Sequence, residues 1–149
     1  MKRLVFTVGN EMMGDDAAGP LLAQLLKRLP VAGWQVLDGG PVPENSLHLV
    51  RDLQPELILV VDAAEMGLAA GSIRHLSEED IADQFLMTTH NLPLTFLIGA
   101  LKEIAPEVRF LGIQPSVISF AYPVSSGVRN AVAEIHERLQ SGHLDYPGL

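Results

Sequence analysis

The stretch that decides the fold is "RLVFTVGNEMMGDDAAGP", residues 3–20. It begins with an apolar run typical of a buried strand and continues with a glycine-rich turn. Gly9 and Gly14 have the G-x-x-x-x-G spacing of a phosphate-binding loop, which would continue with Lys and Ser or Thr. This chain continues with Asp15 and Asp16, whose carboxylates repel a phosphate. A nucleotide site, which the fold class alone would permit, is therefore disfavoured.

The composition indicates a single domain, residues 1–149, and its 48% of apolar residues is enough for a sizeable core. A net charge of −8 makes nucleic acid and anionic membranes poor partners. No stretch reaches the roughly 18 apolar residues of a membrane span, and the first apolar run is too short for a signal peptide. The absence of cysteine excludes disulfides and thiolate metal ligands. We expect a cytoplasmic monomer with a loose tail over residues 141–149.

Strand-like and helix-like segments alternate along the chain, which predicts an α/β fold with helices on a mostly parallel sheet. Apolar, β-branched runs predict buried strands over residues 4–8, 34–37, 57–61 and 108–113. Apolar residues at helical spacing predict helices within residues 18–29, 94–104 and 126–139. Ser77 to Asp80 fits the cap of a further short helix that ends near residue 85.

One further strand departs from the parallel pattern. Residues 72–76 read as a strand, yet only residues 63–71 separate them from Asp62, at the end of the preceding strand. A parallel crossover needs roughly a dozen residues or more. We therefore expect this strand to run antiparallel at an edge of a sheet of about five strands.

Three side chains form the candidate site. Ligands of open α/β sheets bind beyond the carboxyl ends of the strands. Asp16 follows the first predicted strand, Asp62 follows the third, and His90 lies in "MTTHNLP" before a helix. Each has a structural explanation by itself: a helix cap for Asp16, a partner of loop amides for Asp62, and a solvated ring for His90. Asp15 is the more natural cap or turn residue. Together, two carboxylates and one imidazole suit a divalent metal of the zinc or nickel type and leave positions open for water or substrate.

The loops around these residues are unusually apolar. We expect about half of their large side chains to cover the end of the sheet. The others would form an apolar surface, which suits a polypeptide partner better than a small polar metabolite. The side chains concerned are Met66, Leu68, Met87, Val117, Ile118, Phe120 and Tyr122.

Five sequence blocks carry a resemblance to a known family: "VGNEMMGDDAAGP", "LDGGPVPEN", "LILVVDAAEMG", "MTTHNLP" and "FLGIQP". They run from Val8 to Pro115, and five blocks in this order and spacing are specific. The chain resembles the hydrogenase maturation endopeptidases of nickel–iron hydrogenases, most of all those of the hydrogenase 3, formate-hydrogenlyase type. The resemblance implies a three-layer α/β/α sandwich around a twisted sheet, in agreement with the predicted elements.

The resemblance also implies an activity. Such an endopeptidase removes the C-terminal extension of the hydrogenase 3 large-subunit precursor after nickel insertion. By motif, the family's metal ligands fall on Asp16, Asp62 and His90, which would be catalytic and would recognise nickel supplied by the precursor or another divalent cation in its place. The alternative is a non-catalytic nickel-binding chaperone or checkpoint for the same precursor. Ala17 departs from the pattern, since many members have Gly there, and alanine adopts positive φ only at a cost; the first helix is therefore expected to start slightly differently.

Overall fold

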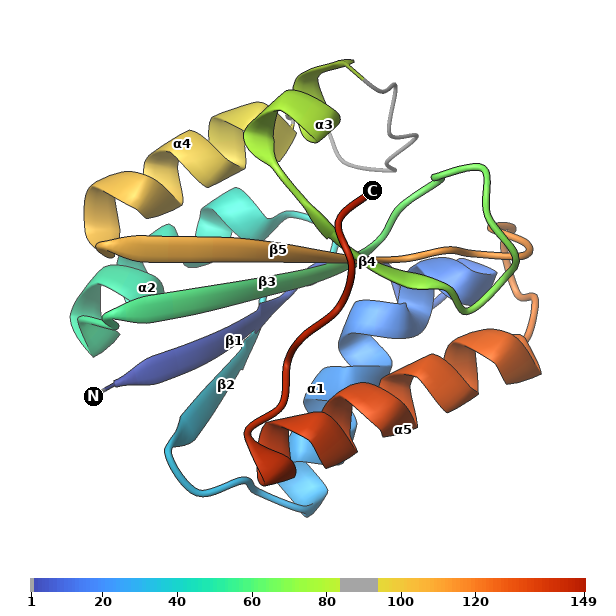
Figure 1. Cartoon of the computed structure of the whole chain (residues 1–149), viewed down its shortest axis with the longest axis horizontal. Helices are drawn as coiled ribbons and strands as arrows, with labels where there is room; N and C mark the ends of the chain where they lie inside the picture. Colours follow the sequence, from blue (N-terminus) through green and yellow to red (C-terminus); the bar gives the residue numbers. More distant parts are fainter. Residues whose placement is uncertain (1, 84–93) are drawn as a thin grey trace.

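A twisted five-stranded sheet forms the centre of the computed structural model, which describes residues 2–83 and 94–149. Its strands lie in the order β2-β1-β3-β5-β4 (Figure 1). The bounds are β1 Arg3–Thr7, β2 Trp34–Asp38, β3 Leu57–Ala63, β4 Ile73–Leu76 and β5 Glu107–Ile113. Four strands are parallel, and β4 pairs antiparallel with β5 at the edge. The predicted α/β class and the antiparallel edge strand are confirmed.

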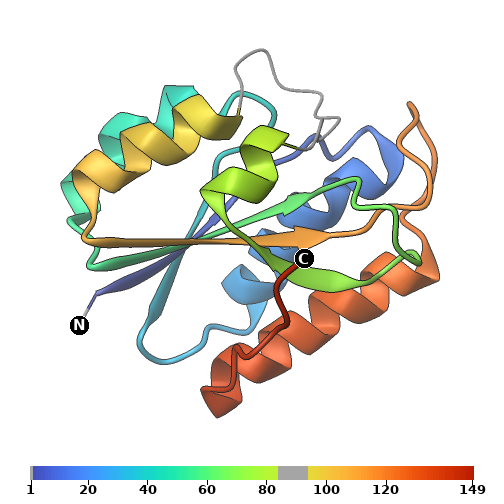
Figure 2. The same cartoon turned by 45° about the horizontal axis from the view of Figure 1, so that its top comes forward.

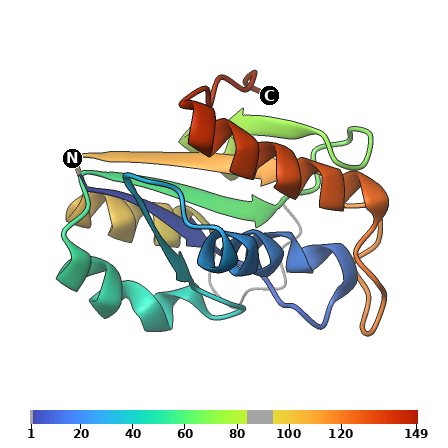
Figure 3. The ribbon, with the colours of Figure 1, turned by 90° about the horizontal axis from the view of Figure 1, so that it is seen from below.

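Helices cover both faces of the sheet, which makes the three-layer sandwich (Figures 2 and 3). Helices α1 and α5 lie on one face, and α2, α3 and α4 lie on the other. The α-helices are α1 Ala18–Arg28, α2 Leu47–Leu53, α3 Glu78–Asp83, α4 Leu94–Ile104 and α5 Ser126–Ser141. Two short 3-10 helices, η1 Gly14–Ala17 and η2 Pro43–Ser46, precede α1 and α2. Across the described residues, none of these helices has the length and apolar character that a membrane crossing requires.

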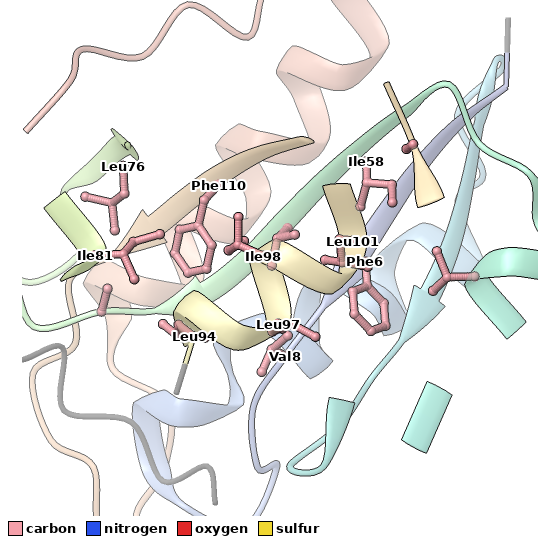
Figure 4. Packing of buried hydrophobic residues seen from close by; sticks show 14 of the residues in the cluster. Phe6, Val8, Ile58, Leu76, Ile81, Leu94, Leu97, Ile98, Leu101 and Phe110 are labelled. Carbon is pink, nitrogen blue, oxygen red and sulfur yellow. The ribbon is translucent and has the colours of Figure 1, made fainter. Parts of the chain in front are cut away.

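The apolar runs of β1 and β3 form strands because both of their faces are covered by helices. On one face, Phe6, Ile58 and Leu101 are fully buried between the sheet and α4 (Figure 4). On the other face, Leu22 of α1 and Ile135 of α5 are fully buried against the sheet. Each face therefore has its own core, and the sheet is held rigidly between the two cores.

Helix ends follow the sequence signals closely. Ser77 and Asp80 form the predicted capping box: the Asp80 backbone N–H donates to Ser77 Oγ at 3.0 Å, and the Ser77 N–H donates to the Asp80 carboxylate at 3.0 Å. Ser125 caps α5, where its hydroxyl oxygen accepts a bond from the Val128 N–H. The expected extension of α3 to residue 85 ends outside the described residues. Helix α2 was not predicted, because its seven residues are too short for a clear apolar period.

The C-terminal segment, expected to be a loose tail, lies along β4 in the structure. The His75 backbone N–H donates to the carbonyl of Pro147 at 2.9 Å, and the His75 ring nitrogen Nε2 lies 2.9 Å from the carbonyl oxygen of Leu144. Residue Gly148 forms an isolated parallel bridge to His75. Because β4 is an edge strand, one side of its backbone is not paired with another strand, and the C-terminal segment forms hydrogen bonds there.

Tyr146 anchors this segment to α5. Its hydroxyl donates to Glu134 at 3.3 Å, and the guanidinium of Arg138 lies 4.3 Å from the ring centre. Burial, together with the negative charge of Glu134, raises the pKa of Tyr146 well above its usual range. The phenol therefore remains a neutral donor to Glu134.

Two glycines in helices provide a matched test of this packing. A Cβ added at Gly19 of α1 would lie 2.3 Å from the Val8 carbonyl oxygen and 3.1 Å from that of Val61, whereas one at Gly99 of α4 would meet nothing within 4 Å. We predict that Gly19→Ala destabilises the protein by about 1–3 kcal/mol because α1 must move off the sheet. Gly99→Ala should stabilise it by about 0.5–1 kcal/mol through helix propensity. Urea unfolding of both variants measures this, and equal stabilities would contradict the packing at Gly19.

Candidate functional site

The carboxyl ends of the parallel strands meet at one edge of the sheet. Thr7 of β1 pairs in register with Asp38 of β2 and with Val61 of β3, and Asp62 pairs with Gly112 of β5. The loops that follow these strands therefore start side by side. The sequence argument placed the candidate site at this edge, and the topology agrees with that argument.

The two glycines of the first turn allow close approach within the protein itself. Gly9 has φ +144°, and an added Cβ would lie 2.1 Å from the backbone oxygen of Asp16. Gly14 has φ +58°, and an added Cβ would lie 2.5 Å from the Val117 carbonyl oxygen. The first glycine lets the chain fold back onto η1, and the second lets η1 touch the loop after β5. The two glycines at phosphate-loop spacing thus allow a compact turn, and this turn carries Asp15 and Asp16.

Asp16 lies in η1, immediately before α1, and its side chain is buried. The backbone N–H of Asn10 donates to Asp16 Oδ2 at 2.9 Å, which fixes the carboxylate over the end of β1. Ala17 has φ −77°, so alanine is unstrained at the position where the family often has glycine. The departure at Ala17 therefore has no backbone cost.

Asp62 is the penultimate residue of β3 and is completely buried. Strand β3 contacts η1, and the backbone N–H of Val8 donates to the carbonyl of Val61 at 3.0 Å. Asp16 and Asp62 consequently belong to two adjacent elements at the same edge of the sheet. Burial of two carboxylates at the end of neighbouring strands is costly, and such a cost is commonly retained where a site needs the charges.

His90, the third predicted ligand, lies outside the described residues. Within the two described ranges, no group of three His, Cys, Asp or Glu side chains is arranged to hold a metal ion. The structure therefore brings the two acids to one edge, and the assembly of all three ligands stays a prediction.

Asp15 has a larger structural role than that of a helix cap. Its buried carboxylate accepts three hydrogen bonds: from the Ser116 N–H at 2.7 Å, from the Ser125 N–H at 2.7 Å and from the Ser125 hydroxyl at 2.8 Å. Its own N–H donates to the carbonyl of Val117 at 2.8 Å. These partners are about a hundred residues away in sequence, so the sequence signal was limited to the presence of a second acid beside Asp16.

Gln114 organises the loop after β3. Its Oε1 accepts bonds from the backbone N–H groups of Met66 at 2.7 Å and Leu68 at 3.3 Å. Its Nε2 donates to the carboxylate of Glu65 at 2.9 Å and to the carbonyl of Pro115 at 3.1 Å. The loop that starts directly after Asp62 is thereby tied to the end of β5. Gln114 lies in the sequence block "FLGIQP", and the sequence alone gives no signal for the role of its side chain.

The apolar loop residues divide between core and surface, and Ile118 is half-buried. Met66 is buried, and Leu68 packs partly buried against the same cluster. Val117, Phe120 and Tyr122 are exposed. Met87 lies outside the described residues.

Comparison with known sequences identifies one family. The family model described as hydrogenase maturation protease (HycI) matches residues 20–141. The chain is 49% identical to the hydrogenase 3 maturation protease of Escherichia coli K12, across 94% of this chain and 90% of that protein. It is 30% identical to a putative hydrogenase maturation protease of Methanocaldococcus jannaschii, across 93% of this chain and 90% of that one.

Solved structures agree with the sequence matches. A crystal structure of the hydrogenase 3 maturation protease superposes with a TM-score of 0.92 at 45% identity, covering 100% of this chain and 97% of that one. The crystal structure of the maturation protease HycI from Thermococcus kodakarensis superposes with a TM-score of 0.81 at 25% identity, covering 94% and 92%. Each match extends over nearly the whole fold.

The hydrogen bonds of Gln114 lead to a stability prediction. Gln114→Leu removes the acceptor of two backbone N–H groups, and we expect it to lower the free energy of unfolding by about 2–4 kcal/mol. Amide hydrogen exchange at Met66 and Leu68 should accelerate. Gln24→Leu, on the exposed side of α1, is the control and should change neither quantity. Unchanged exchange at Met66 in Gln114→Leu would contradict the proposed anchoring of this loop.

Proposed function

Because the chain belongs to the hydrogenase maturation protease family and is an endopeptidase, we propose that its substrate is the nickel-loaded precursor of the hydrogenase 3 large subunit. It would remove the C-terminal extension of this precursor in the cytoplasm, after nickel insertion. The 49% identity to the Escherichia coli hydrogenase 3 maturation protease supports this choice of substrate.

The observation that carries the proposal is the pair of buried acids at one edge of the sheet. Asp16 is fixed by the Asn10 amide, and Asp62 is fixed by its place near the buried carboxyl end of β3. In this proposal both carboxylates, together with His90, recognise the nickel ion that arrives on the precursor. Carboxylate and imidazole are suitable ligands for such an ion.

The chemistry follows from the residues present. The chain has no cysteine, so a thiol nucleophile of its own is excluded. A divalent ion lowers the pKa of a bound water and makes it a competent nucleophile near neutral pH. In this proposal Asp16 and Asp62 would hold the ion, and either carboxylate could accept the proton that the bound water loses. The water oxygen bonds to the scissile carbonyl carbon, the C–N bond breaks, and the leaving amine takes up a proton.

The proposal is tested by mixing the precursor, prepared with and without nickel, with this protein and recording intact masses over time. We expect a C-terminal peptide to be lost only from the nickel-loaded form. Asp16→Asn and Asp62→Asn preserve shape but lose charge, and each should slow processing by about 100-fold. Asp52→Asn, an exposed acid on α2, is the matched control and should process normally.

Each other outcome changes a defined part of the proposal. Cleavage of both precursor forms would retain the peptidase and reject nickel recognition. Normal processing by Asp16→Asn and Asp62→Asn would reject the assigned roles of the two acids. Complex formation with an unchanged precursor mass would favour a non-catalytic checkpoint.

A further inference from the structure

Exposed apolar side chains gather in two loops beside the candidate site. Met12 is 53% exposed in the loop after β1, and Val117, Phe120 and Tyr122 are 42%, 67% and 57% exposed in the loop after β5. We call these four residues the Phe120 surface. Large exposed aromatic side chains that cluster in this way are typical of protein–protein contact sites rather than of an ordinary solvated loop.

The two loops are joined to each other by backbone hydrogen bonds. The Ala121 N–H donates to the carbonyl of Met12 at 2.9 Å, and the Asp15 N–H donates to that of Val117 at 2.8 Å. The Asp15 carboxylate holds both ends of the second loop, at Ser116 and Ser125. The Phe120 surface is therefore attached directly to the turn that carries Asp16.

The tip of the second loop has a strained backbone. Ala121, between the two exposed aromatic residues, has φ 63°, a left-handed conformation that is unfavourable for alanine. Its N–H bond to Met12 holds that conformation. Because Ala121 is held in this conformation, Phe120 and Tyr122 lie on a loop tip that is bonded to the first loop. Their side chains stay exposed.

The charged residues around the Phe120 surface indicate which kind of partner binds there. The loops after β1, β2, β3 and β5 (residues 8–17, 39–46, 64–72 and 114–125) contain no Lys or Arg. Seven acids lie in them or at the ends of their strands: Glu11, Asp15, Asp16, Asp38, Glu44, Asp62 and Glu65. Lys27, Arg28 and Lys102 lie near the ends of α1 and α4, at the opposite edge. Two cations lie closer: Arg129 of α5 donates to the Val124 carbonyl at 3.2 Å, and Arg74 of β4 pairs with Gly112. The acids of this edge outnumber them. An apolar surface inside an acidic edge complements a polypeptide with an apolar centre and Lys or Arg around it. A second copy of this chain would bring the same negative charge.

We propose that the Phe120 surface is the docking site of the precursor polypeptide, and that it places the bond to be cut beside Asp16. This inference rests on the proposed function. The substrate contacts the enzyme at two adjacent places: its metal-bearing part at the acids, and an apolar segment on Phe120 and Tyr122. The hydrogen bonds of Asp15 fix the distance between the two places.

The test measures kcat and KM for nickel-loaded precursor with the double variant Phe120→Ser/Tyr122→Ser. We expect KM to rise about tenfold or more while kcat changes less than about twofold, because both side chains are exposed and act only in docking. Leu29→Ser/Leu49→Ser removes two exposed apolar side chains elsewhere and should leave both constants unchanged. The single variants Phe120→Ser and Tyr122→Ser give intermediate values of KM and replace the double variant if it does not fold.

Salt tests the charge argument separately. Raising NaCl from about 0.05 to 0.5 M should raise the KM of the unmodified protein severalfold, because salt screens exposed charges.

An unchanged KM in the double variant, or a loss confined to kcat, would overturn the docking surface while leaving the peptidase intact. A dimer that the double variant abolishes would assign the surface to a second copy of the chain. No cleavage by the unmodified protein would instead reject the proposed function.

Discussion

The carboxylate of Asp15 is the interaction on which the arrangement of this edge depends. One buried side chain accepts three hydrogen bonds from the two ends of the loop after β5, while its backbone N–H donates to Val117 of the same loop. Hydrogen bonds to a charged acceptor contribute about 1.5–3 kcal/mol each, and a buried donor left without an acceptor is costly. The turn after β1, the loop after β5 and the start of α5 are therefore positioned as one unit. Asp16 belongs to this unit because it is the next residue.

The neighbouring acids Asp15 and Asp16 thus divide two roles between them. Asp15 faces three donors, so its charge is compensated inside the protein. Asp16 receives an amide bond from Asn10 and lies next to the strand end where Asp62 is buried. The packing of the two hydrophobic cores, one on each face of the sheet, offsets the free-energy cost of burying these charges. Glycine at positions 9 and 14 is necessary for the same reason, since a side chain there would push the turn away from its partners.

Much of the fold could be predicted because its signals are local. The buried strands show as apolar runs, and the short connection before residues 72–76 excludes a parallel crossover, which predicts the antiparallel β4. The capping box at Ser77 and Asp80 is likewise visible in sequence. The edge location of Asp16 and Asp62 follows from the rule for parallel sheets.

The partners of Asp15 and Gln114 could not be predicted, because they depend on contacts between residues far apart in the chain. The anchored tail was missed because its polar and glycine-rich sequence shows no sign of the pairing offered by β4.

A division of the site between enzyme and substrate explains how such a peptidase can be selective. Under the proposed function, the enzyme supplies fixed carboxylates and a docking surface, and the precursor supplies the metal. Under this proposal the precursor's ion activates the attacking water, so a polypeptide without the ion would bind and dissociate uncleaved. An ion without the correct polypeptide would be held by few ligands and beside no scissile bond. Selectivity then requires both contacts at once, at a separation that the backbone of one turn keeps constant. The rigid attachment of the Phe120 surface to Asp16 is the structural feature that such a two-point recognition needs.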